Sequence, residues 1–236
     1  MNYFIAGTDT GAGKTAVTAG LLGAWRSRGH RVAGMKPVAA GVDAAGHNED
    51  VDALAAVSAP ELPAAALNPY LLPAPTSPHI AARLAGREID FERLDAAYAT
   101  LVAMTDRVLV EGAGGWRVPL TDTVLMSDLA RRWRLPVVLV AGIRLGAINH
   151  TLLTVEAIER DGCPLRGWIA NVVDSTYAYA DATIDTLAAR IGPPCLARLP
   201  FVPGLRPAGL AERLTSVALA LEDATPPPGT SSRTAP

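Results

Sequence analysis

The chain has little of several features that would assign it to a specialised class of protein. Its 236 residues include only two cysteines, four histidines and 5% aromatic residues. Cys163 and Cys195 lie far apart and lack the spacing of metal ligands. They therefore predict buried thiols in a reducing compartment and exclude a disulfide framework.

A strong charge of either sign is also missing. The net charge is -2 and the pI is about 6.1, which gives no support for a nucleic-acid partner. Apolar runs such as residues 135–143 have the length of a strand and are too short to span a membrane. The first residues lack the basic segment and long apolar run of a secretory signal, so we expect a cytoplasmic protein.

What the chain does contain is an ordinary globular composition, with 50% hydrophobic and 19% charged residues. Helical patterns over 14–28 and 147–160 alternate with short apolar runs. This alternation predicts a single-domain α/β fold, a doubly wound parallel sheet of the P-loop NTPase type, with ligands beyond the carboxyl ends of its strands. The strands are expected at 2–7, 31–38, 107–115, 135–143, 165–173 and 194–200.

Two segments depart from this pattern. Residues 60–78 hold six prolines and predict a largely irregular excursion before a helical part over 79–104. Residues 224–236 lack apolar residues that could pack, so we expect a domain over 1–223 and a disordered tail.

The first candidate site is the stretch "GTDTGAGKT" at residues 7–15. A P-loop usually places four residues between its glycines, whereas five separate Gly7 from Gly13. The alternative is an ordinary glycine-rich turn. Since a strand precedes the loop and a helix follows it, we expect Lys14 to reach phosphates and Thr15 to ligate Mg²⁺.

Two other strand ends carry charges that suit the same chemistry. Glu111 ends an apolar strand, and Mg²⁺ prefers carboxylate oxygens, although a solvated strand end is the simpler interpretation. Lys36 ends the second strand, which is expected beside the first, so its ammonium group could enter the same crevice or could be solvated.

Another loop leads into a helix near Ala147. The free N–H groups at the start of such a helix suit an anion. His150 follows in the first helical turn, where packing or capping is favoured over catalysis. His79 is similarly open to more than one interpretation.

Together these segments resemble the dethiobiotin synthetase family. The resemblance rests on "GTDTGAGKT", "KPVAAG", "NPY", "PTSPHIAA", "VEGAGGW", "LGAINHTLLT", "GWIANVV" and "LPFVPG", in this order. The family's own loop has five residues between its glycines. The resemblance implies carboxylation and ring closure of 7,8-diaminononanoate with CO₂ and MgATP, giving dethiobiotin, ADP and phosphate through a carbamate and its mixed anhydride with phosphate.

The resemblance also implies roles for individual residues. Lys36 and Lys14 match the catalytic lysines, and Thr15, Asp52 and Glu111 match the Mg²⁺ ligands. The expected ATP-binding residues are Thr10, Gly11, Ala12, Gly13, Lys14, Thr15, Asp52, Glu111, Gly112, Ala113, Gly114 and, at the adenine, Asn171, Pro200, Phe201 and Val202. The expected substrate-binding residues are Lys36, Ala40 and, from the neighbouring subunit of a homodimer, Leu145, Gly146, Ala147, Ile148 and Asn149.

Three positions depart from the pattern of some family members. Gly11 stands where they have Glu, Ala40 where they have Ser, and Val172 where an acid follows the adenine-site asparagine. Val172 therefore predicts a looser preference for adenine over other bases. The main rival is a ParA/MinD-like switch ATPase, whose loop typically carries a second lysine that this loop lacks. A glutamine-dependent synthase is a weaker rival, since no glutaminase domain is present.

Overall fold

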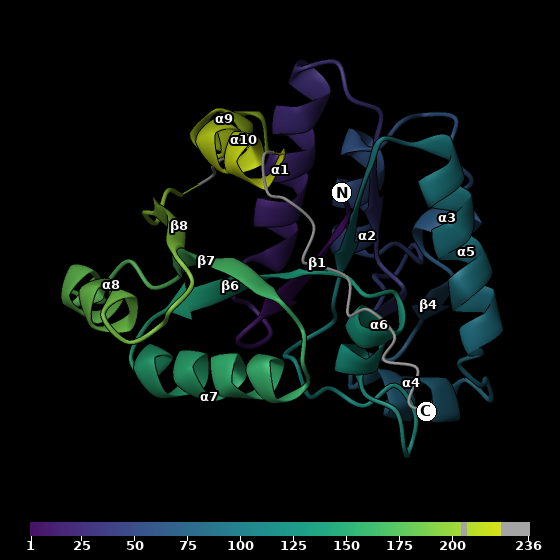
Figure 1. Cartoon of the computed structure of the whole chain (residues 1–236). Coiled ribbons are helices and arrows are strands. Elements are labelled where there is room, and N and C mark those ends of the chain that lie inside the picture. The colour runs from purple at the N-terminus through teal and green to yellow at the C-terminus, as the bar shows by residue number, and fades with distance from the viewer. Residues whose placement is uncertain (204–206, 223–236) are drawn as a thin grey trace, which may run out of the picture.

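The computed structural model describes residues 1–203 and 207–222; the tail expected over 224–236 lies outside them. Its centre is a six-stranded sheet, of which Figure 1 labels β1, β6, β7 and β8. The strand order is β2-β5-β1-β6-β7-β8, and every neighbouring pair is parallel. The strands are β1 (Tyr3–Gly7), β2 (Val32–Met35), β5 (Arg107–Glu111), β6 (Val137–Ile143), β7 (Leu165–Val172) and β8 (Cys195–Leu199). The predicted parallel α/β fold is confirmed.

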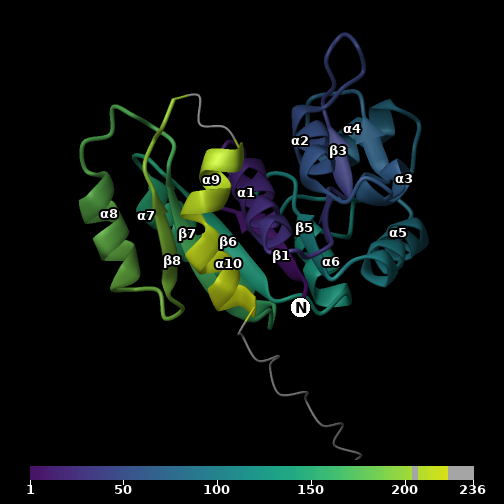
Figure 2. The ribbon, with the colours of Figure 1, turned by 90° about the horizontal axis from the view of Figure 1, so that it is seen from above.

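Helices cover both faces of this sheet (Figure 2). The α-helices of the described residues are α1 (Lys14–Ser27), α2 (Glu49–Val57), α3 (Ala64–Leu67), α4 (Pro78–Leu84), α5 (Phe91–Met104), α6 (Met126–Arg132), α7 (Ala147–Arg160), α8 (Ala180–Ala188), α9 (Pro207–Arg213) and α10 (Thr215–Glu222). The helices predicted over 14–28 and 147–160 are confirmed as α1 and α7. No helix within residues 1–203 and 207–222 combines the length and apolar character needed to cross a bilayer.

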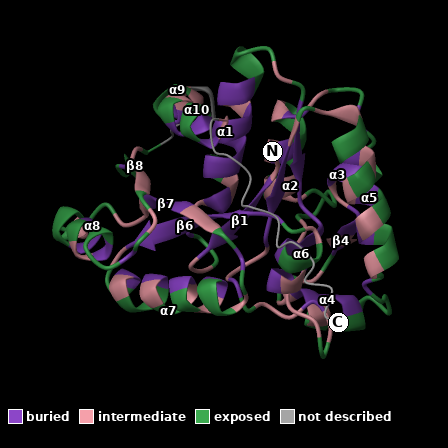
Figure 3. Cartoon of the chain, viewed as in Figure 1, coloured by how far each residue is buried: buried purple, intermediate pink, exposed green. Residues whose placement is uncertain are grey.

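Two apolar cores form because successive side chains of a strand point to opposite faces. Along β1, Tyr3 and Ile5 pack with α1, α9 and α10. Phe4 and Ala6 pack on the other side, where α5, α6, α7 and α8 contribute. β1, β2, β5 and β6 are consequently buried along most of their length, whereas β8, at the edge of the sheet, is mostly half-buried (Figure 3).

The predicted strand at 31–38 is in fact two strands. β2 ends at Met35, and β3 (Val38–Ala40) pairs with β4 (Tyr70–Leu72) in a separate two-stranded sheet. Between them, Lys36 N–H donates to the carbonyl of Leu67 at 2.8 Å. The expected neighbour of β2 was also wrong, because β5 lies between β2 and β1. This order places the end of β5, with Glu111, directly beside Lys36.

The proline-rich segment is largely irregular, as expected, but it holds two short regular elements. Residues 60–78 contain α3 and β4, which are short enough to fit between the prolines. The helical part expected over 79–104 is divided into α4 and α5. Gly86 has φ +62°, which ends the first helix, and the Asp90 carboxylate caps the second by accepting from Glu92 N–H at 2.9 Å.

Candidate active site

The loop between β1 and α1 presents backbone N–H groups at a helix start. Gly13, the residue before α1, has φ +87° and offers no side chain to cap the helix. The first N–H groups of the helix are thus available to an anion, and the helix dipole favours negative charge there. This is the geometry that a phosphate-binding loop requires.

Gly7, which five residues separate from Gly13, lies against the side chain of Lys14. A Cβ atom added at Gly7 would lie 2.8 Å from both Cδ and Nζ of Lys14. Lys14 therefore folds back over the end of β1, and its ammonium group donates to the Asp9 carbonyl at 3.0 Å. Burial, and then the positive charge of Lys36, lower the pKa of Lys14 to about 8.

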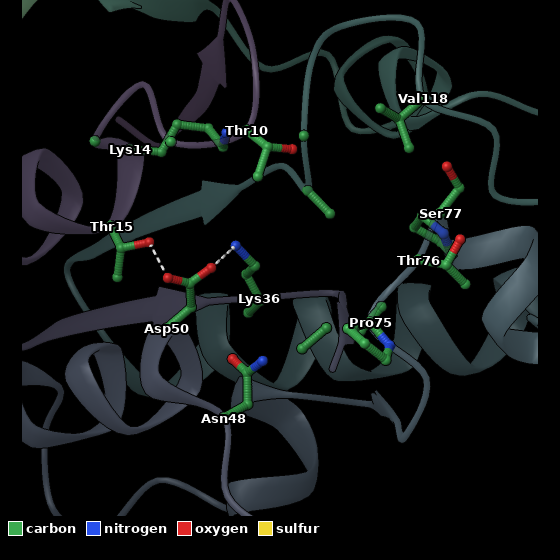
Figure 4. Close-up of a pocket in the computed structure, with 17 residues that line it drawn as sticks. Thr10, Lys14, Thr15, Lys36, Asn48, Asp50, Pro75, Thr76, Ser77 and Val118 are labelled. Carbon is green, nitrogen blue, oxygen red and sulfur yellow. Dashed lines mark hydrogen bonds and ion pairs between the residues drawn. The ribbon is translucent and has the colours of Figure 1, made fainter. Parts of the chain in front are cut away.

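Four polar side chains converge beside this loop, and Figure 4 shows three of them, Thr15, Lys36 and Asp50. Lys36 Nζ lies 2.7 Å from Asp50 Oδ2 and 2.7 Å from Glu111 Oε1. The Thr15 hydroxyl lies 2.6 Å from Asp50 Oδ1 and 2.7 Å from Glu111 Oε1. The sequence prediction that Lys36, Thr15 and Glu111 share one crevice is thus matched by their positions, and we call these four residues the acid–lysine cluster.

Burial makes the charges of this cluster interdependent. Glu111 is fully buried and Lys36 is 3% exposed. Burial opposes the charged form of Lys36, but Glu111 and Asp50 outweigh it and raise the pKa of the ammonium group. Burial likewise opposes ionisation of Asp50, and the attraction of Lys36 outweighs it and lowers the pKa of that carboxyl.

The structure corrects the expected position of one metal ligand. Asp52 is exposed, and its carboxylate lies 3.3 Å from His47 Nδ1, outside the acid–lysine cluster. Asp50 occupies the place expected for it. Residues two apart on a helix do not share a face, so α2 can direct only one of these acids toward Thr15. The Asn48 cap, whose Oδ1 accepts from Val51 N–H at 3.2 Å, marks the start of α2 and was a signal from which Asp50 could have been chosen.

The donors of the cluster fit a magnesium ion. Glu111 Oε2 is buried and has no hydrogen-bond partner among the described residues, so it is a free oxygen on the carboxylate whose Oε1 contacts Thr15. The described residues hold no group of three or more His, Cys, Asp or Glu side chains that could cage a metal. Mg²⁺ does not need one, because it usually takes one or two carboxylates together with phosphates and water.

A cavity of about 600 Å³ opens from the loop and the cluster. One end is polar, with Lys14, Thr15, Lys36 and Asp50; at the other end Val118 lies near Thr76 and Ser77 (Figure 4). Its remaining lining comes from Thr10, Gly11, Gly13, Ala39, Ala40, Asn48, Pro75, Pro78, Ala113 and Gly114. Such a cavity suits a ligand that is charged at one end and uncharged at the other.

The expected adenine residues lie outside this cavity. Asn171, near the end of β7, donates from Nδ2 to the Ala12 carbonyl at 2.9 Å. Its amide nitrogen lies so close to Gly13 that a Cβ there would be 2.2 Å away. Pro200, Phe201 and Val202 follow β8, the neighbour of β7. These segments meet at the same edge of the sheet, and their contact with a base stays a prediction.

The expected carboxylate-binding segment at the start of α7 also lies outside the cavity. Gly146 precedes α7 with φ +89° and provides no side-chain cap. Leu145 is 84% exposed, and Arg144 pairs with Asp9 of the phosphate loop at 2.9 Å. His150 is exposed in the first turn, so of the two expected roles, packing and capping, packing is wrong. His79 is half-buried, and its Nδ1 has no hydrogen-bond partner among the described residues.

The parallel sheet, the loop with its lysine and the strand-end acid define a P-loop nucleotide-binding protein. A sequence profile described as "AAA domain" matches residues 1–208. Among solved structures, the MinC:MinD cell division protein complex of Aquifex aeolicus has a TM-score of 0.58 at 13% identity, over 96% of this chain and 97% of that chain. At that identity the likeness concerns the fold alone.

Sequence comparison narrows the class. The chain is 50% identical to the ATP-dependent dethiobiotin synthetase BioD of Aromatoleum aromaticum, over 90% of this chain and 96% of that protein. It is 46% identical to the enzyme of the same name from Xanthomonas euvesicatoria pv. vesicatoria, with the same coverage. The chain belongs to the dethiobiotin synthetase family.

Proposed function

We propose that this chain is an ATP-dependent dethiobiotin synthetase, acting on 7,8-diaminononanoate and CO₂. The observation that carries the proposal is the acid–lysine cluster at the polar end of the cavity, directly beside the phosphate loop. Phosphoryl transfer requires mainly positioning and neutralisation of charge, and the cluster is built from groups that supply both. The names of the relatives give the proposal its product and its dependence on ATP, and the family resemblance implies the two other substrates.

The first steps need no nucleophilic side chain. An amine of the substrate adds to CO₂ and loses a proton, giving a carbamate. A carbamate oxygen attacks the γ-phosphorus of ATP, and ADP leaves. The second amine then attacks the carbamoyl carbon and loses a proton, which closes the ureido ring as phosphate leaves. The chain's contribution is to hold these groups in line and to exclude competing water.

Each residue at the polar end of the cavity has a role in this series of reaction steps. Lys14 and the N–H groups at the start of α1 hold the phosphates of ATP. Lys36 lies between the loop and the cavity, where its ammonium group balances the negative carbamate and the charge that develops during transfer. Thr15, Asp50 and Glu111 are the residues that would hold Mg²⁺, which neutralises phosphate charge when it is bound.

We further propose a homodimer in which residues 145–149 of one subunit bind the substrate carboxylate at the other subunit's cavity. Two observations support it: the free helix start at Gly146 and the exposure of Leu145 in a segment that lies outside its own cavity. The looser base preference expected from Val172 and the cytoplasmic location stay predictions.

A ParA/MinD-like switch ATPase shares this fold and is the alternative function. The loop between Gly7 and Lys14 contains no second lysine, which argues against it. The deciding experiment measures ADP release and dethiobiotin by mass spectrometry. We expect ADP release to require both diaminononanoate and bicarbonate, with one dethiobiotin formed per ADP. ATP turnover that ignores both substrates would overturn the assignment.

A further inference from the structure

Asp161, a carboxylate outside the cavity, binds two consecutive side chains of the loop that follows β5. Trp116 Nε1 donates to Asp161 Oδ2 at 2.8 Å. Both terminal nitrogens of Arg117 also donate to it, at 2.8 Å to Oδ2 and 2.9 Å to Oδ1. The Asp161 side chain is only 11% exposed, so its charge is compensated mainly by these three hydrogen bonds.

The loop held in this way forms one wall of the cavity. Ala113, Gly114 and Val118 line it. The loop is also tightly packed: a Cβ atom at Gly114 would lie 2.8 Å from Val118 Cγ2, and one at Gly115 would lie 3.4 Å from the Thr8 carbonyl oxygen. A small shift of the loop therefore moves the cavity wall, because close-packed neighbours leave no space to absorb it.

The loop has an apolar anchor on one side and Asp161 on the other. Trp116 is 3% exposed, and its ring meets Phe4 of β1 edge to face, with centroids 5.8 Å apart. Asp161 is the C-terminal cap of α7, and its own N–H donates to the Ala157 carbonyl at 3.1 Å. The polar anchor is thus attached to a 14-residue helix and not to the loop itself.

We propose that Asp161 is a positioning residue for the diamine substrate, because it fixes the wall that carries Val118. This rests on the proposed function. Val118 stands near Ser77 and Thr76, at the end of the cavity away from Thr15 and Asp50 (Figure 4). The polar end is where the phosphates and Mg²⁺ belong, so the apolar chain of the substrate is the part that this wall contacts.

The test is steady-state kinetics of Asp161→Ala and Asp161→Asn in the full-length protein. We expect KM for diaminononanoate to rise about tenfold in Asp161→Ala, the effect of losing an apolar contact of one or two methylene groups. Asp161→Asn keeps an acceptor for Trp116 and should raise this KM less. In both variants the rise in KM for diaminononanoate should exceed any rise in KM for MgATP, although Ala113 and Gly114 of the same loop are expected to contact ATP, and kcat at saturation should stay within about twofold of the wild-type value.

The chain offers a matched control. Asp95 accepts from Trp133 Nε1 at 2.7 Å and from Arg132 Nε at 2.8 Å, which repeats the chemistry of the Asp161 site away from the cavity lining. Asp95→Ala should lower the melting temperature without changing KM for the diamine. Equal KM values for the diamine in Asp161→Ala and Asp95→Ala would overturn the proposal. An equal rise in KM for the diamine and for MgATP in Asp161→Ala would also overturn it.

Two further measurements distinguish a variant that does not fold, a failure of the proposed function and a failure of the role of Asp161. If Asp161→Ala does not fold, Arg117→Gln serves instead, since it removes the charge pair, leaves the Trp116 bond and should raise the diamine KM by an intermediate factor. Wild-type protein is assayed for dethiobiotin first. Absence of product there rejects the proposed function, whereas product with unchanged KM in the variants rejects only the role of Asp161.

Discussion

Replacing Lys36 with methionine tests the acid–lysine cluster most directly. The substitution keeps an unbranched stem in a site that is 3% exposed but removes the cation that lies 2.7 Å from both Asp50 and Glu111. Glu111, fully buried, would then keep the Thr15 hydroxyl as its only direct side-chain partner within residues 1–203 and 207–222. Asp50 is partly exposed and can be hydrated, so the loss is concentrated on Glu111.

The expected cost follows from breaking a buried ion pair by removing one partner. Such a change costs about 3–5 kcal/mol, and the hydration of Asp50 favours the lower end. For a chain of 236 residues, a loss of about 3 kcal/mol lowers the melting temperature by about 6–12 °C. Turnover should fall about 10²–10³-fold, as it does when one preorganised charge-stabilising donor is removed.

Urea unfolding followed by tryptophan fluorescence, without nucleotide or Mg²⁺, gives the free energy of unfolding. Arg83→Ala is the control: Arg83 pairs with Asp122 at 2.8 Å, but both side chains are largely exposed, so the loss should stay below about 1 kcal/mol. The double variant Lys36→Met/Glu111→Gln removes both charges and should be more stable than Lys36→Met alone. Equal losses in Lys36→Met and Arg83→Ala, or no recovery in the double variant, would refute the reasoning.

Three further predictions concern the loop, the metal ligands and a buried thiol. Gly7→Ala should lower kcat/KM for ATP at least about tenfold, because its Cβ would lie 2.8 Å from the loop lysine; Gly192→Ala, with nothing within 4 Å, should match wild type. Asp50→Asn should raise the Mg²⁺ concentration for half-maximal activity about tenfold or more, whereas Asp52→Asn should not, and the reverse result would restore Asp52 as the ligand. Burial, and then the charge of a nearby aspartate, raise the pKa of Cys163 from 9.0 to about 11. The folded protein therefore retains this proton while the unfolded chain releases it, so stability should fall as the pH rises from 9 to 11. Cys163→Ala should lessen that fall in urea titrations, and an unchanged pH profile would contradict the assignment.

The sequence predicted those features that depend on short stretches of chain. Apolar periodicity located β1, α1 and α7 almost to the residue, because the spacing of buried side chains along a strand or helix is a local property. The strand–loop–helix context of Lys14 and Thr15 likewise predicted the phosphate loop before any tertiary contact was known.

Other features of the site could not be obtained in this way. Lys36 was expected beside β1 and lies beside β5, since strand order depends on which crossovers bury the most apolar surface and not on local pattern. Asp50 and Asp52 are equivalent by composition. Only the packing of α2 decides which of them faces Thr15, because side chains two apart on a helix point to different sides.

By itself, the sequence determined the phosphate loop and the acid that ends a strand, since each lies within about ten to fifteen consecutive residues, and the kind of fold, since the alternation of such local segments along the chain predicts it. The tertiary structure decided what those groups meet. It brought Lys36 between Asp50 and Glu111, folded Lys14 over the bare backbone of Gly7, and joined Asp161 to a loop 45 residues earlier in the chain. Contacts of that kind are selected by the packing of whole elements, so no local window of sequence contains them.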